Sequence, residues 1–175
     1  MQFVHLPVTQ ETLAQSGLRP WFSCVSRISW FPLLHGYGLN NVVKGLPRIG
    51  AVGEQRFVVE PQHAIDFAED GMPAVLCTPW LIWFLEHAAR GAVLPWLEPG
   101  ESTVGLEIEL RHLAPTPVGQ TVTCAARIIQ VEGGRIMFQL EARDETELIA
   151  RGVHKLQIIQ VEGFARRVSR KAGPR

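Results

Sequence analysis

The sequence lacks the features that define several large classes of protein. No apolar run approaches the roughly 18 residues that a membrane-spanning helix needs. Residues 1–5 lack the basic start of a secretory signal peptide. Three cysteines are too few, and odd in number, for a disulfide framework. We therefore expect a soluble cytoplasmic protein with no membrane partner.

Excess charge and ligand-binding motifs are also missing. Lys+Arg and Asp+Glu each number 17, so the formal net charge is zero and nucleic acid is not the expected partner. No Cys-x-x-Cys or His-x-x-x-His pair occurs, so no metal site is predicted. A glycine-rich phosphate loop is missing too, and we expect no bound cofactor.

The length and composition predict one globular domain between two flanking segments. A chain of 175 residues with 46% apolar residues can bury a sizeable core. Residues 1–50 show no sustained periodicity and are treated as an N-terminal extension of unknown role. The domain spans 51–165. The basic segment 166–175 is expected to be a solvated, frayed tail.

A buried helix stands near the start of this domain. A short strand is predicted over 55–60, followed by a loop over 62–74 with room for a helical turn. Thr78 is a good N-cap and Pro79 suits the first helical position. The helix should run to residue 93 or 94, before Pro95. Its nearly continuous apolar character is typical of a helix wrapped by a sheet.

Successive strands follow the helix. They are predicted over 104–113, 121–131, 135–143 and 148–161. Gly133 and Gly134 predict a tight turn between two of them. In the first strand, the even positions from Leu106 to His112 should share the face turned toward the helix. The order predicts an α+β fold, an antiparallel sheet curled round one long helix.

Three polar side chains among apolar neighbours are the candidate catalytic residues. Thr78, Glu86 and His112 offer a hydroxyl, a carboxylate and an imidazole, the parts of a hydrolytic site. Each also has a structural interpretation. Thr78 could only cap the helix, Glu86 could lie on an exposed or dimer-facing stripe, and His112 could be a core histidine. Cys77 is an alternative nucleophile, although small core packing is its commoner role.

The spacing on the helix constrains how Thr78 and Glu86 could meet. Eight residues separate them, which is about 80° of rotation and 12 Å of rise on an ideal helix. The two side chains would not meet along one helix. A common site requires Thr78 to fold back, or a site built across a dimer.

Several motifs together resemble one family. Residues 52–164 resemble the hotdog-fold thioesterases of the fluoroacetyl-CoA thioesterase type. The resemblance rests on Thr78 with Glu86 eight later, on Gly105 with His112 seven later, and on short stretches elsewhere. These stretches are Val-Gly-Glu at 52–54, Trp-Leu-Glu-Pro-Gly-Glu at 96–101, Ala-Pro-Thr-Pro-Val-Gly at 114–119, Val-Glu-Gly at 131–133 and Gly-Val-His at 152–154.

This resemblance implies a hotdog fold, a homodimer and hydrolysis of an acyl-CoA thioester. CoA would then be part of the substrate, not a cofactor. The family's catalytic threonine, glutamate and histidine fall on Thr78, Glu86 and His112. Its glycine near the thioester falls on Gly105, where a missing side chain would let the substrate approach the backbone.

Two departures from the family pattern bear on the substrate. Met72, before Pro73, replaces an aromatic gate, and Leu156 replaces an arginine. With these two as substrate-binding residues, a short or medium apolar acyl-CoA is expected in place of fluoroacetyl-CoA. His154 also matches and is interpreted as structural. The alternative function is a non-catalytic acyl-CoA-binding module; an acyl-CoA hydratase would need an Asp and His pair that is not seen.

Overall fold

The computed structural model describes residues 45, 47–65 and 67–173. The predicted N-terminal extension therefore lies almost entirely outside the described residues. The order of the elements is β1 (Val52–Val58), η1 (Pro61–His63), η2 (Ala68–Asp70), α2 (Thr78–Val93), η3 (Leu94–Trp96), β2 (Glu101–His112), β3 (Thr121–Glu132), β4 (Arg135–Arg143), β5 (Leu148–Gln160) and α3 (Val161–Ala172).

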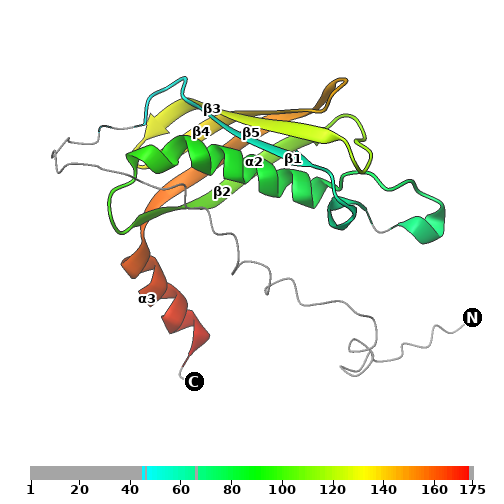
Figure 1. Ribbon diagram of the computed structural model, residues 1–175. Helices are drawn as coiled ribbons and strands as arrows, with labels where there is room; N and C mark the ends of the chain where they lie inside the picture. Colours follow the sequence, from blue (N-terminus) through cyan, green and yellow to red (C-terminus); the bar gives the residue numbers. More distant parts are fainter. Residues whose placement is uncertain (1–44, 46, 66, 174–175) are drawn as a thin grey trace, which may run out of the picture. The chain divides into compact units, whose positions relative to one another are not determined.

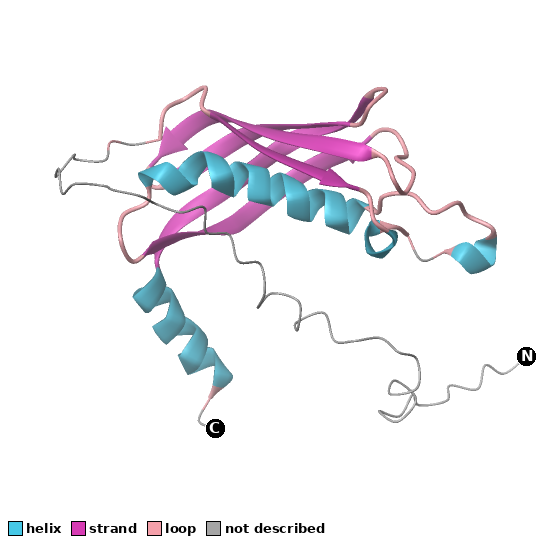
Figure 2. Ribbon diagram, in the orientation of Figure 1, coloured by secondary structure: helices cyan, strands magenta, loops and turns pink. Residues whose placement is uncertain are grey.

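One curled sheet and one long helix make up the domain (Figures 1 and 2). The five strands pair in the order β1-β3-β4-β5-β2, and every pair is antiparallel. α2 lies across one face of this sheet, as Figure 1 shows. The α+β prediction of a sheet wrapped round a long helix is confirmed. β1 and β2 are the two edge strands.

Close packing of α2 on the sheet positions the helix. Its Leu81, Leu85 and Ala88 have no exposed surface and meet fully buried sheet residues such as Phe138. β1 passes especially near the helix at Gly53, where an added Cβ would lie 2.0 Å from the carbonyl oxygen of Ala88. Only glycine permits this approach. β1 begins at Val52, three residues before the predicted strand.

The tight turn between β3 and β4 is confirmed. Gly133 and Gly134 both have positive φ, 53° and 80°. Two consecutive residues with positive φ are the requirement of the hairpin turn whose twist matches the flanking strands. The turn fixes the register in which Glu132 pairs with Arg135.

The expected inward face of the predicted strand 104–113 is interrupted by a β-bulge. Gly105 pairs with Leu156 and Glu107 pairs with Lys155, so Leu106 has no partner on β5. Leu106 was predicted to face the helix, and this was wrong, since the side chain is 52% exposed. An extra residue in one strand shifts the alternation of side chains. Beyond the bulge, Ile108, Leu110 and His112 are partly buried as predicted.

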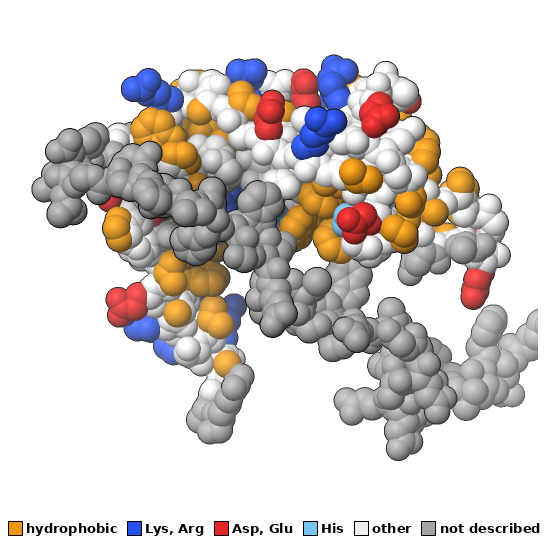
Figure 3. Space-filling view, in the orientation of Figure 1, with side chains coloured by type: hydrophobic (Ala, Val, Ile, Leu, Met, Phe, Trp, Pro, Cys, Tyr) orange, Lys and Arg blue, Asp and Glu red, His pale blue; other side chains and the backbone are white. Residues whose placement is uncertain are grey.

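The chain after β5 differs from the predicted frayed tail. It forms α3, which crosses the expected boundary at residue 165. Val161, Phe164 and Val168 are spaced to share one face of the helix, and each is about half exposed. The rest of α3 consists of Glu162, Ser169, small residues and four basic residues, and Figure 3 shows apolar and basic side chains together on this helix. No helix among the described residues is long and apolar enough to cross a membrane.

Candidate active site

Thr78 begins α2 but does not cap it. The N-cap is Cys77, with extended backbone angles and no side-chain hydrogen bond to the helix. The prediction that the Thr78 hydroxyl caps the helix is wrong by one position. As the first helical residue, Thr78 turns its hydroxyl elsewhere, and Oγ1 lies 3.0 Å from Nδ1 of His112.

Backbone hydrogen bonds fix the segment that carries Thr78. The N–H of Cys77 donates to the carbonyl of His63 at 2.9 Å, and the N–H of Leu76 donates to that of Thr116 at 2.8 Å. Thr116 is completely buried. The two residues before Thr78 are thus anchored to two different segments, and this holds the Thr78 hydroxyl at a defined place.

His112 ends β2 and faces the helix, as its strand position predicted. It pairs with Ala150 of β5, and the next residue, Leu113, donates its N–H to the carbonyl of Ile149 at 2.8 Å. Pairing with β5 therefore fixes the backbone that carries the imidazole, at the point where the chain leaves the sheet. A hydrogen-bonding contact between His112 and Thr78 joins the sheet to the start of the helix.

Burial lowers the pKa of His112 below its ordinary value, and the backbone at Ala114 partly offsets this effect. A lowered pKa keeps the imidazole neutral at neutral pH, as a general base requires. Within the described part of the chain its buried Nε2 has no hydrogen-bond partner. Nδ1 either accepts the Thr78 hydroxyl proton or donates its own, depending on the tautomer.

A cavity opens beside this pair. Its volume is about 410 Å³, comparable to small-ligand sites. The lining residues are Ile65, Val75, Leu76, Cys77, Thr78, His112, Leu113, Ala114 and Pro115. Sequence reasoning did not find the lining around Ile65 and 113–115. Those residues lie in loops, where no periodic pattern predicts which side chains meet.

Glu86 and Gly105 form a second group. Glu86 is partly buried in the middle of α2, and its Oε1 lies 3.3 Å from where a Cβ on Gly105 would be. Gly105 thus gives the carboxylate room over β2. Glu86 forms no hydrogen bond or ion pair with the described residues. The structure brings Thr78 to His112 and Glu86 to Gly105, but it does not bring these two pairs together in one chain.

The two predicted substrate-binding residues are in different surroundings. Leu156 is 1% exposed and pairs with Gly105 across the β2–β5 ladder. Its predicted inward orientation is confirmed, and it lies beside the Glu86 group. Met72 is 49% exposed in the loop after η2 and does not line the cavity. Among the residues described, no three His, Cys, Asp or Glu side chains form a group that could hold a metal ion.

A sheet of this order around a single helix is the architecture of hotdog-fold thioesterases, and solved thioesterases similar to this chain share it. This chain is a thioester hydrolase of that class. More narrowly, the chain belongs to the fluoroacetyl-CoA-specific thioesterase family, whose pattern matches residues 59–162.

Individual relatives agree with this assignment. A fluoroacetyl-CoA thioesterase of Streptantibioticus cattleyicolor is 35% identical over 132 residues, covering 71% of this chain and 94% of that protein. A solved structure of the fluoroacetyl-CoA thioesterase FlK has a TM-score of 0.66 and 33% identity, covering 71% of this chain and 96% of the other. A thioesterase superfamily member from Thermus thermophilus gives 0.65 and 33%, covering 71% and 95%.

Proposed function

We propose that this enzyme hydrolyses a short or medium acyl-CoA to the free acid and CoA, using Thr78, Glu86 and His112. The observation that carries the proposal is the 3.0 Å contact between Thr78 Oγ1 and His112 Nδ1 at the edge of a cavity. Relatives support the substrate class. FlK variants were solved with fluoroacetate and CoA, and with acetyl-CoA.

His112 is the proposed general base. Burial lowers its pKa, so the ring is ready to accept a proton at neutral pH. The proton comes from the Thr78 hydroxyl, which then attacks the thioester carbonyl, or from a water that Thr78 positions. In the first route the C–S bond breaks, the CoA thiolate takes the proton from His112, and the acyl group stays on Thr78 as an ester that a water then hydrolyses to the free acid. In the second route the water adds to the carbonyl directly, the C–S bond breaks, the thiolate takes the proton, and the acid is released. Neither route calls for a cofactor.

Glu86 is proposed to orient the His112 imidazole and to stabilise its positive charge once it is protonated. Because Glu86 does not reach His112 within one chain, this role requires a second chain. Gly105 and His112 lie seven residues apart on the edge strand β2. If two copies pair antiparallel along β2 about a twofold axis midway between them, Gly105 of one copy lies opposite His112 of the partner subunit. Glu86 then joins the partner's Thr78 and His112. We therefore propose a homodimer whose sites each use two chains.

The free thiols support the compartment that we propose. Cys77 and Cys124 are both free, which suits a reducing environment. We therefore place the enzyme in the cytoplasm, where CoA thioesters would be its substrates.

The acyl group is proposed to be larger and more apolar than fluoroacetyl. Leu156 adds buried apolar surface beside Gly105. Met72 lies outside the cavity lining in one chain, and we propose that its flexible thioether leaves the site without the family's aromatic gate. Each buried methylene is worth roughly 0.8 kcal/mol, so a few carbons can change kcat/KM by about one or two orders of magnitude.

A panel of acyl-CoAs, followed by release of the CoA thiol, tests this function. Butyryl- or hexanoyl-CoA should be hydrolysed faster than acetyl- or fluoroacetyl-CoA. The highest kcat/KM on fluoroacetyl-CoA would contradict the proposed substrate class. Tight binding of acyl-CoA with no thiol release would instead support the alternative, a non-catalytic binding module.

A further inference from the structure

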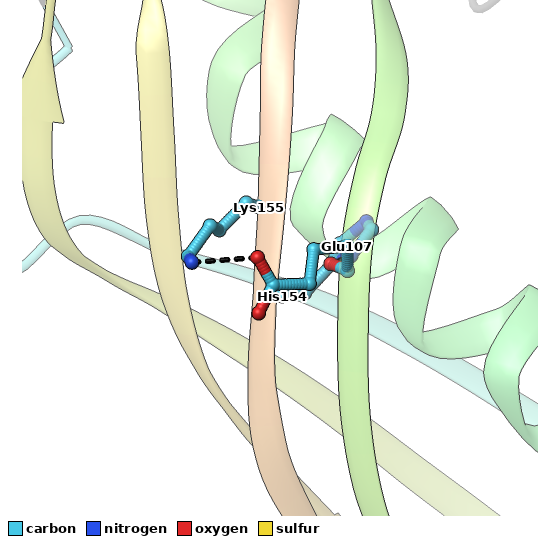
Figure 4. Close-up of polar contacts among 3 residues, drawn as sticks. All are labelled: Glu107, His154 and Lys155. Atoms are coloured by element: carbon cyan, nitrogen blue, oxygen red, sulfur yellow. Dashed lines mark hydrogen bonds and ion pairs between the residues drawn. The ribbon is translucent and has the colours of Figure 1, made fainter.

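His154 is a buried histidine of β5 next to the Glu86 group. Only 2% of it is exposed. Its Nδ1 lies 2.8 Å from the carbonyl oxygen of Glu107 on β2 (Figure 4). Because a carbonyl can only accept, Nδ1 carries the hydrogen and donates it. In the neutral ring Nε2 is then an unprotonated acceptor, and it has no partner among the described residues.

The carbonyl that His154 holds belongs to the β-bulge. Glu107 is the first residue paired again after Leu106 leaves the β2–β5 ladder. Bulges are frequent next to active sites, where they redirect the chain and its side chains. A side-chain hydrogen bond across the strands fixes where this bulge ends.

The same ring borders the space above Gly105, on the other side of the bulge. A Cβ on Gly105 would lie 3.6 Å from Cε1 of His154 and 3.3 Å from Oε1 of Glu86. The imidazole and the carboxylate therefore converge on one backbone position. His154 thus hydrogen-bonds Glu107 and borders the space that a side chain on Gly105 would fill.

We propose that His154 is a positioning residue of the thioesterase site. By holding the Glu107 carbonyl, it fixes the bulge and keeps Gly105 beneath the Glu86 carboxylate. This inference rests on the proposed function, because Glu86 is the group through which His154 acts. A displacement of about 1 Å at a reacting group can cost as much as 100-fold in rate.

Two substitutions separate the donor from the bulk of the ring. His154→Asn keeps an N–H donor close to the position of Nδ1, whereas His154→Leu has none. His154→Leu should lower kcat about 10- to 100-fold with little change in KM, and His154→Asn should recover most of this loss. Equal losses in both variants would overturn the role of the hydrogen bond.

Lys155→Met is the matched control at the same partner residue. Lys155 Nζ binds Oε2 of Glu107 at 2.6 Å, but the side chains of this pair are 35% and 56% exposed. Figure 4 shows this ion pair, which does not involve the Glu107 carbonyl. Exposed pairs contribute little, so kcat should stay within about twofold of wild type. A loss equal to that of His154→Leu would overturn the proposal.

A double-mutant cycle shows whether His154 acts through Glu86. In a Glu86→Gln background, His154→Leu should lower the residual kcat by less than about twofold, because the group it positions is already altered. A merely structural residue would give the same fold loss in both backgrounds, and that result would contradict the proposal.

Nuclear magnetic resonance separates this inference from the proposed function. If the wild-type protein released thiol from no acyl-CoA, the function would fail, but the His154 tautomer would still be measurable. We expect Nδ1 to carry the proton at pH 8.5. A proton on Nε2 would overturn the inference whatever the activity, even if His154→Leu failed to fold.

Discussion

At the scale of single residues, the hydrolytic chemistry that we propose depends on one hydroxyl and one imidazole. Thr78 is exposed at the start of α2, and its hydroxyl meets the partly buried ring of His112 at 3.0 Å. The sequence predicted where the helix starts but placed the cap one residue too late. Helix ends are poorly specified by sequence because several adjacent side chains can take the capping position.

The pH dependence of hydrolysis should report the environment of His112. A general base must be neutral, and burial lowers the pKa of this imidazole below 6.5. Activity should therefore rise with pH through a midpoint below 6.5. The measurement is kcat/KM against pH with a thiol reagent that works in acid. If the rise in kcat/KM had its midpoint above pH 7, the assignment of His112 as the base would be contradicted.

Thr78 and Cys77 are separated by three substitutions. Thr78→Ala should lower kcat about 10²-fold, because it removes the hydroxyl beside the base but no helix cap. Thr78→Ser should retain more activity, and Cys77→Ala should cost far less than Thr78→Ala. Steady-state kinetics on one acyl-CoA decide this. Inactivity of Cys77→Ala, together with inactivation of the wild type by iodoacetamide, would reverse the two roles.

At the scale of elements, the contact between β1 and α2 holds the helix against the sheet. A Cβ on Gly53 would lie 2.0 Å from the carbonyl oxygen of Ala88 and 2.6 Å from the nitrogen of Ala92. Gly53→Ala should therefore force the strand and helix apart and destabilise the fold by about 1–3 kcal/mol.

The control for Gly53→Ala is a glycine of α2 itself. A Cβ on Gly91 would meet nothing within 4 Å. Gly91→Ala should stabilise the protein by about 0.5–1 kcal/mol, because alanine loses less conformational entropy in a helix. Denaturant unfolding measures both changes. Equal stability of Gly53→Ala and wild type would show that this close approach does not hold the helix.

The sequence predicted most elements because their signals are local. α2 has continuous apolar character, and the Gly133–Gly134 turn has a distinctive residue pair. The bulge at Leu106 could not be predicted, since it depends on how β5 and the His154 ring meet β2. α3 was missed because its basic residues suggested a solvated tail, although Val161, Phe164 and Val168 have helical spacing.

At the scale of the whole molecule, candidate site residues could be named from the sequence, but how they assemble could not. The spacing along α2 already indicated that Thr78 and Glu86 do not meet on one helix. The structure keeps the Thr78–His112 pair apart from Glu86 and Gly105 within the chain. A single sequence specifies residue types and local elements, whereas a site shared between two chains depends on how the edge strands β2 pair.

Mixed dimers test the central claim, that Glu86 of one chain and Thr78 and His112 of the other form an acyl-CoA-hydrolysing site. Homodimers of Glu86→Gln and of His112→Ala should each lose about 10²-fold or more in thiol release. A dimer with one chain of each variant contains one intact shared site. Co-expressed with two tags and purified through both, it should recover about half of the wild-type turnover.

The decisive comparison is a second mixed dimer, which pairs a wild-type chain with a chain carrying both substitutions. Shared sites predict almost no thiol release from this dimer, because each site then contains one altered residue. A site within one chain predicts the opposite pattern, about half the wild-type turnover here and none from the first mixed dimer. That pattern, or near wild-type activity of either variant homodimer, would contradict the account.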